Sequence, residues 1–151
     1  MIRPALIEDV AGIAMMGRDF HANSIYAQFH YDDIKVANYI ATVIEAEEGI
    51  VFVSVDEDGK INGAIMGWLT DHWFGDDTLL CDLAFYVAPS VRGGFVAARL
   101  LKKFMEYGEY MGATQIQISN SSGYNRDRIG LMFERLGMQH VGYVFAHNTK
   151  E

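Results

Sequence analysis

The stretch from residue 78 to residue 112, TLLCDLAFYVAPSVRGGFVAARLLKKFMEYGEYMG, is the part of the sequence that most constrains the fold. An apolar run from Leu79 to Val87 predicts a buried strand, and Pro89 marks a turn after it. Two glycines, Gly93 and Gly94, then precede a helix whose apolar residues recur every three or four positions. Because the first N–H groups of a helix have no intrahelical partner, this strand–turn–helix unit predicts a phosphate-binding turn.

The turn does not contain the dinucleotide pattern G-x-G-x-x-G or the pattern G-x-x-x-x-G-K-[ST]. It reads V-x-P-x-x-R-G-G-x-x-A-x-x-L from Val87 to Leu100. This resembles the acetyl-coenzyme A signature R/Q-x-x-G-x-G/A of the GNAT superfamily of acetyltransferases, and most of all its short phage-type members. Arg92 takes the first position and Ala97 the last, but Phe95 replaces the central glycine, so Gly94 is the alternative for the close contact. An ordinary glycine-rich connection without a ligand is the other interpretation.

A second segment, LMFERLGM from Leu131 to Met138, resembles the GNAT signature L-Y-E-K-L-G-F, and the opening I-R-P-A-x-x-x-D resembles the start of many family members. Together the resemblances cover most of the chain. They imply one acetyltransferase-like α/β domain over residues 1–151, in which helices flank a mixed central β-sheet with a splayed strand pair. From the residues we also expect helices from residue 10, at 33–47 and 126–136, and strands at 50–55, 61–70, 114–119 and 139–147.

The resemblance implies that acetyl-coenzyme A lies between the splayed strands. The strand backbone would pair with the pantetheine arm, the N–H groups of the turn and the helix start would hold the pyrophosphate, and two residues further along would lie near a family asparagine. No metal is expected. The implied cofactor residues are Phe85, Tyr86, Val87, Arg92, Gly93, Gly94, Phe95, Val96, Ala97, Ala98, Asn125 and Arg126.

Acyl transfer to an amine requires removal of an ammonium proton and protonation of the leaving thiolate. Asp82 is the candidate base, because the family often places an acid near this point of the central strand; it is alternatively a structural hydrogen-bond acceptor. Strict alternation of the strand places Asp82 on the face opposite Leu83. The family often uses a tyrosine as the acid where this chain has Phe133, so we expect Tyr124 to replace it, with Tyr86, Tyr143 or water as alternatives.

Two aromatic segments are candidates for the acceptor site. In the first, HANSIYAQFHY, the residues Tyr26, His30 and Tyr31 either contact the substrate or close the edge of the core. In the second, DHWFGDD, His72 and Trp73 either attract an amine through charge and cation–π interactions or belong to a solvated hairpin loop.

The chain of 151 residues has a net charge of −8, which argues against nucleic acid or an anionic membrane as a partner. Residues 92–135 carry seven basic and four acidic side chains, a balance of +3 that leaves −11 for the rest. This distribution suits an anionic cofactor and a cationic acceptor. The single Cys81 and the absence of a leader pattern predict a cytoplasmic protein, inside the host cell if the source is a phage, and a C-terminal edge strand predicts a possible homodimer.

The sequence therefore predicts an N-acetyltransferase that moves an acetyl group from acetyl-coenzyme A to a primary amine of a small or peptidic acceptor. The alternative is a catalytically weak or inactive coenzyme A-binding or protein-interaction module of the same fold. Phe95 and Phe133, at two family signature positions, are the observations that keep this alternative open.

Overall fold

The computed structural model describes residues 1–123 and 126–150, which form a single α/β domain around a five-stranded sheet. The sheet order is β1-β2-β3-β4-β5; neighbouring strands are antiparallel except β4 and β5, which are parallel. The strands are β1 (Ile2–Pro4), β2 (Gly49–Val55), β3 (Ile61–Asp71), β4 (Thr78–Val87) and β5 (Gln115–Gln117). The helices are α1 (Val10–Ala22), α2 (Asp33–Glu45), α3 (Val96–Tyr110) and α4 (Arg126–Arg135), with short 3-10 turns η1 (Ile7–Asp9), η2 (Ile25–Gln28) and η3 (Pro89–Val91).

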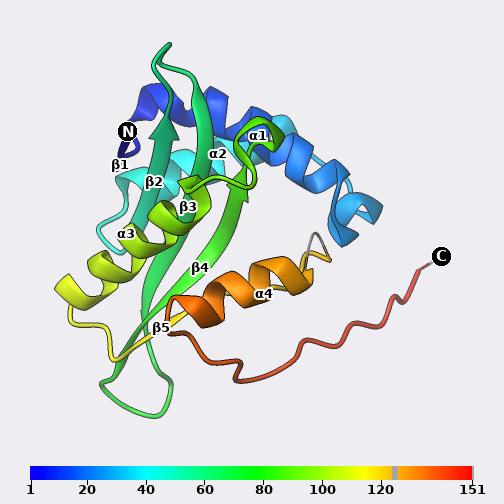
Figure 1. Cartoon of the computed structure of the whole chain (residues 1–151). Helices are drawn as coiled ribbons and strands as arrows, with labels where there is room; N and C mark the ends of the chain where they lie inside the picture. The colour runs from blue at the N-terminus through cyan, green and yellow to red at the C-terminus, as the bar shows by residue number, and fades with distance from the viewer. Residues whose placement is uncertain (124–125, 151) are drawn as a thin grey trace.

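Helices cover both faces of the sheet (Figure 1). On one face, α1 and α2 pack against β2 and β3 around fully buried residues such as Val43 and Val53. On the other face, α3 lies against the sheet through Phe104, which packs with Leu80 of β4, and α4 adds Phe133 to the same cluster. This mixed, helix-flanked sheet confirms the predicted fold class. No helix in the described ranges is long and apolar enough to cross a membrane.

β4 contains an irregularity that the sequence pattern does not reveal. Met66 of β3 faces Ala84, but the next residue, Gly67, faces Asp82, so Leu83 has no partner in β3. Such a bulge makes the side-chain alternation shift by one residue. Leu80, before the bulge, belongs to the apolar cluster of Phe104 and Phe133. Phe85, after the bulge, packs against the same cluster, although it is an odd number of residues away. The expectation of uninterrupted alternation from Leu79 to Phe85 is therefore wrong, and the bulge places Asp82 at a kink in the strand.

The two parallel strands pair over a short distance and then separate. β4 and β5 are matched from Leu79 with Gln115 to Cys81 with Gln117, and the pairing ends there. β4 continues to Val87, and β3 remains its partner on the other side. The edge of β4 from Asp82 onward therefore opens toward the loop after β5, which confirms the expected splayed strand pair.

The predicted C-terminal strand is not formed. Residues 139–147 have no regular secondary structure, and the side chains of Tyr143 and Phe145 are 79% and 90% exposed. Figure 1 shows why: after α4 the chain runs away from the sheet, so this alternating segment meets no strand edge with which to pair. β5 is also shorter than predicted, and α2 ends at Glu45 because Ala46 is already extended.

Candidate active site

The glycine turn between β4 and α3 has the geometry of an anion-binding loop. Gly93 has φ of +85°, a conformation that a side chain would strain. At Gly94 a Cβ would lie 3.3 Å from the Val91 carbonyl oxygen, so the lack of a side chain keeps the turn tight. Helix α3 begins at Val96, and the N–H groups of its first turn have no acceptor within the helix. The turn therefore offers backbone donors at the positive end of the helix dipole.

Arg92 is turned back toward β4. Its Nε donates to the Val87 carbonyl oxygen at 3.0 Å, and its guanidinium carbon lies 5.2 Å from the centre of the Tyr86 ring. Tyr86 in turn donates its hydroxyl to Asp19 of α1. Burial lowers the pKa of Arg92, an effect that the Asp19 carboxylate opposes. These contacts fasten the turn to the end of β4 and to α1.

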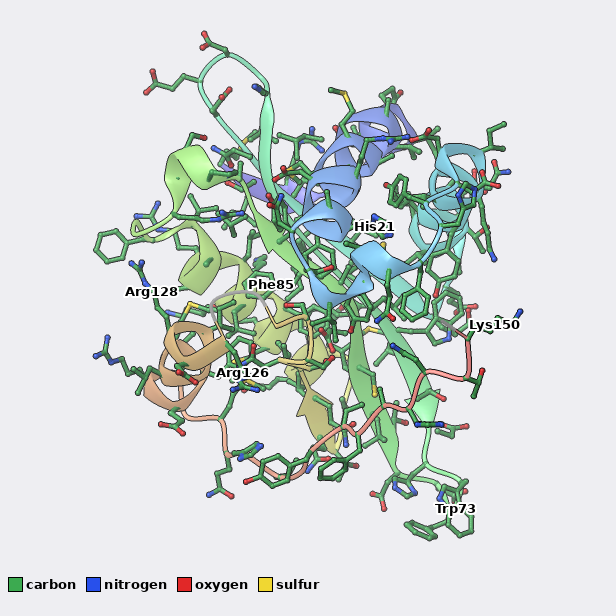
Figure 2. The ribbon with its side chains drawn as sticks, turned by 90° about the vertical axis from the view of Figure 1, so that its right-hand side faces the viewer. His21, Trp73, Phe85, Arg126, Arg128 and Lys150 are labelled. Carbon is green, nitrogen blue, oxygen red and sulfur yellow. The ribbon has the colours of Figure 1, made fainter. Side chains whose placement is uncertain are left out.

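A second arginine, which the sequence analysis did not single out, lies over the turn. A Cβ at Gly93 would be 3.5 Å from Nη2 of Arg128, in the first turn of α4. Arg128 is exposed, and no ion pair holds it within the described part of the chain. Figure 2 shows it on α4, close to the glycine turn. The proximity of Arg128 to Gly93 depends on how α4 packs. The only sequence signal for a role of Arg128 was therefore the net positive charge of residues 92–135.

Phe95 does not place its ring in the turn. Its side chain is 74% exposed, and the guanidinium carbon of Arg99 lies 5.9 Å from the ring centre. Phe95 is the N-cap residue of α3 and Arg99 lies four positions later, so the ring lies along the outside of the helix.

A cavity of about 250 Å³ opens where β4 and β5 separate. Its walls are the bulged part of β4, the loop after β5, one side of α4, and the aromatic side chains of Phe20 and Tyr26 from the opposite layer. The lining residues are Phe20, Tyr26, Asp82, Leu83, Ala84, Phe85, Ser119, Asn120, Ser121, Ser122, Ile129 and Phe133. The cavity thus brings together the candidate base, one predicted cofactor residue and one predicted acceptor residue.

Asp82 is the titratable group with the most strongly altered acidity in this cavity. Burial raises the pKa of its carboxyl to about 6, although the N–H of Ser119, which donates to Oδ1 at 2.9 Å, favours the charged form. A carboxylate with a pKa close to neutrality is a more effective base than an ordinary, exposed one. The same hydrogen bond also fits the alternative, structural role, and it ties β4 to the loop after β5.

Three hydroxyl groups form a continuous chain beside Asp82. Ser119 Oγ lies 2.7 Å from Ser121 Oγ, which lies 3.1 Å from the hydroxyl oxygen of Tyr26. Tyr26 is held there because the N–H of Ile25 donates to the carbonyl oxygen of Ser122 at 2.8 Å. The η2 turn is therefore attached to the loop after β5 across the cavity.

The other predicted acceptor residues lie outside this cavity. Tyr31 donates its hydroxyl to the carbonyl oxygen of Ala14 at 2.8 Å and thus fastens the connection to α1, while His30 is exposed. His72 and Trp73 lie at the tip of the β3–β4 hairpin, far from Phe85 (Figure 2). The seven steps of β4 between Thr78 and Phe85 alone span about 23 Å. The geometry therefore does not support acceptor contacts by the hairpin.

Tyr124 and Asn125 lie outside the described residues. Arg126 begins α4, and its carbonyl oxygen accepts a hydrogen bond from Asn120 at 2.7 Å while its side chain is exposed. The described residues contain no cluster of three metal-binding side chains. A larger, open groove of about 640 Å³ lies between α3 and the strands β1 and β2, beside Met1 and Lys103. It contains none of the candidate catalytic residues.

The comparisons with known proteins agree on the fold. The family model of the acetyltransferase (GNAT) family matches residues 15–138. Among solved structures, the chain is similar to a tetramutant of the BH1408 protein of Bacillus halodurans, with a TM-score of 0.81 and 17% identity over 98% of this chain and 99% of that one. No curated protein sequence matches.

Two further similar structures are those of named acetyltransferases. Glucosamine-6-phosphate N-acetyltransferase from Arabidopsis thaliana has a TM-score of 0.77 and 14% identity, over 99% of this chain and 98% of that one. An aminoglycoside acetyltransferase from an uncultured soil sample has a TM-score of 0.74 and 15% identity, over 99% and 98% of the two chains. At these identities the likeness shows the fold alone.

Proposed function

The chain belongs to the GNAT family of acetyltransferases, and from this we propose that it is an N-acetyltransferase that moves an acetyl group from acetyl-coenzyme A to a primary amine of a small or peptidic acceptor. The observation that carries the proposal is the position of Asp82, a partly buried carboxyl with a pKa raised to about 6, at the opening between β4 and β5. A base belongs at this point, because the amine must lose a proton before it attacks the thioester.

The residues present fit acetyl-coenzyme A. The unpaired edge of β4 at Phe85, Tyr86 and Val87 can form backbone hydrogen bonds with an extended pantetheine arm. The turn at Gly93 and Gly94 lets a phosphate approach the first N–H groups of α3, from Phe95 through Ala98, without a side chain in the way. When bound, the thioester supplies the activated acetyl group.

We assign the two arginines different roles. Arg128 provides the guanidinium that contacts a phosphate, since it lies over Gly93 and has no ion pair among the described residues. Arg92 is a positioning residue, because its contacts with Val87 and Tyr86 fix the shape of the turn. Arg126 has an exposed side chain whose nearest charged partner is Asp127 at 3.9 Å, so we assign it no direct contact with the phosphate.

Calorimetric titration with coenzyme A tests this division. A charge-assisted hydrogen bond contributes about 1.5–3 kcal/mol, so Arg128→Ala should weaken binding roughly tenfold to hundredfold. The matched control is Arg135→Ala, which removes the same charge from the far end of α4 and should leave binding unchanged. If both variants lose the same coenzyme A affinity, binding depends on the overall charge and not on a specific contact of Arg128. No binding by the native protein would exclude the acetyltransferase and the coenzyme A module alike.

Turnover separates the enzyme from the inactive module. The native protein is incubated with acetyl-coenzyme A and a panel of primary amines, and release of the free thiol is followed. Asp82→Asn should lower kcat by about 10²- to 10⁴-fold if the carboxylate is the base. Binding of coenzyme A without thiol release for any amine would favour the module. The phage-type subgroup and the cytoplasmic location stay predictions from the sequence. The predicted homodimer loses its basis, because the C-terminal edge strand from which it was inferred is not formed.

A further inference from the structure

The acid step of the proposed reaction lacks an obvious donor. Phe133 lines the cavity at the position where the family signature has tyrosine, and it has no proton to give. Tyr86 donates its hydroxyl to Asp19, and Tyr143 is 79% exposed in the C-terminal segment. Asp82, which also lines the cavity, is already assigned as the base. Among the other described residues that line the cavity, the phenol of Tyr26 and the hydroxyls of the serine loop are the remaining oxygen acids.

Of these groups, the phenol is the one with suitable acidity. A tyrosine hydroxyl ordinarily titrates within about two units of a thiol, whereas an aliphatic hydroxyl is a far weaker acid. Tyr26 is also rigidly held: its ring packs on Phe20 with 6.1 Å between the ring centres, and the Ile25–Ser122 backbone hydrogen bond fixes the turn that carries it. Such positioning keeps the hydroxyl at the cavity wall.

The chain of hydroxyl groups leads from the loop beside Asp82, the proposed proton acceptor, to Tyr26. Ser119 donates its backbone N–H to the Asp82 carboxylate, and its side chain is the first of the three linked hydroxyls. Ser121 stands between it and Tyr26, at 2.7 Å and 3.1 Å. Resting on the proposed acetyl transfer, we propose that Tyr26 is the proton donor to the departing thiolate, and that Ser119 and Ser121 carry the proton that restores it.

The step balances as follows. The Asp82 carboxylate takes one proton from the acceptor ammonium, and the neutral amine nitrogen forms its bond to the acetyl carbonyl carbon. As the carbon–sulfur bond breaks, its electron pair stays on sulfur, and Tyr26 gives its proton to that sulfur. The new amide nitrogen passes its second proton to Ser119, Ser119 passes its own to Ser121, and Ser121 passes its own to Tyr26. The products are the N-acetyl amine and the free thiol, and Asp82 later releases its proton to solvent.

Hydroxylamine is the probe that isolates this acid step. It is small enough for the cavity and uncharged at neutral pH, so its attack on acetyl-coenzyme A requires no base. Tyr26→Phe should lower kcat for thiol release by about 10²- to 10⁴-fold, the usual effect of losing a general acid. Asp82→Asn should retain most of the rate with this acceptor. Tyr110→Phe, at the exposed end of α3, is the matched control and should react as the native protein does.

Recovery of activity by a second substitution distinguishes a proton donor from a residue with a purely structural role. Phe133→Tyr, introduced into the Tyr26→Phe variant, returns a phenol to the same cavity and should recover part of the lost kcat. Unchanged coenzyme A affinity in Tyr26→Phe would show that the fold is intact. Ser121→Ala should lower kcat by less than Tyr26→Phe, because water can replace one link of the chain.

Three results would overturn the assignment. These are an unchanged kcat in Tyr26→Phe, a rise in KM for hydroxylamine alone, or a loss of kcat in Tyr124→Phe instead. Each leaves the proposed function standing, because the native protein still turns over. If the native protein binds coenzyme A but releases no thiol with hydroxylamine or any amine, acetyl transfer itself is refuted.

Discussion

Replacing Asp82 by asparagine should stabilise the protein at neutral pH while it impairs turnover. The pKa of Asp82 rises from an ordinary 3.8 to about 6 in the folded chain, chiefly through burial. Between these two values the native state keeps a proton that the unfolded chain has released, so stability falls as pH rises through this window. A shift of about two units at 1.36 kcal/mol each means that the carboxylate costs the fold about 3 kcal/mol above pH 6.

Urea unfolding of both proteins from about pH 3.5 to about pH 7.5 measures this cost. The side-chain amide of the Asp82→Asn variant keeps an oxygen for the N–H of Ser119, so the variant and the native protein should have similar free energies of unfolding at the acidic end. The variant should then gain on the native protein by up to about 3 kcal/mol at the neutral end. Asp76→Asn, on the exposed hairpin loop, corrects for the loss of one negative charge. If the difference in unfolding free energy between the variant and the native protein does not vary with pH, the conclusion that burial disfavours the ionised form of Asp82 is wrong.

Three further substitutions test the packing, the N-terminal ion pair and the turn. Gly108→Ala should cost about 1–3 kcal/mol in urea unfolding, because its Cβ would lie 2.6 Å from the side chain of Ile116 in β5. Asp9→Asn removes the carboxylate that binds Arg3 through both oxygens; the pKa of Asp9 is lowered chiefly by that pairing, so the loss, about 1–2 kcal/mol at pH 7, should shrink as pH falls below 3.8. Phe95→Ala should leave coenzyme A affinity unchanged in calorimetry, since the ring lies outside the turn beside Arg99; a large gain in affinity would contradict this.

The glycine turn could be read from the sequence because its determinants are local. Gly93 adopts a positive φ, and α3 begins three residues later, as a strand–turn–helix pattern requires. The same local reasoning predicted the β2–β3 hairpin and the helix that carries Phe133. The predicted strand at 139–147 failed because strand pairing requires a partner edge, and alternation of apolar residues does not say whether one is within reach.

The site required more than local patterns. Arg92 is the arginine that the motif singles out, and the structure adds that its side chain contacts Val87 and Tyr86. The structure also places Arg128, from another helix, over Gly93. Tyr26 and Ser121, ninety-five positions apart, meet only because η2 docks on the loop after β5. Contacts between such distant residues depend on how layers pack, which a single sequence does not state.

The sequence by itself therefore determined the family, through its two signature segments, and the mixed sheet, the flanking helices and the glycine turn, because hydrophobic periodicity and glycine positions act over a few residues. The tertiary structure alone decided the bulge at Leu83, the raised pKa of Asp82 and the hydroxyl chain that leads to Tyr26. The physical reason is that strand register and burial depend on the packing of the whole domain. The candidate chemistry arises where separate elements meet.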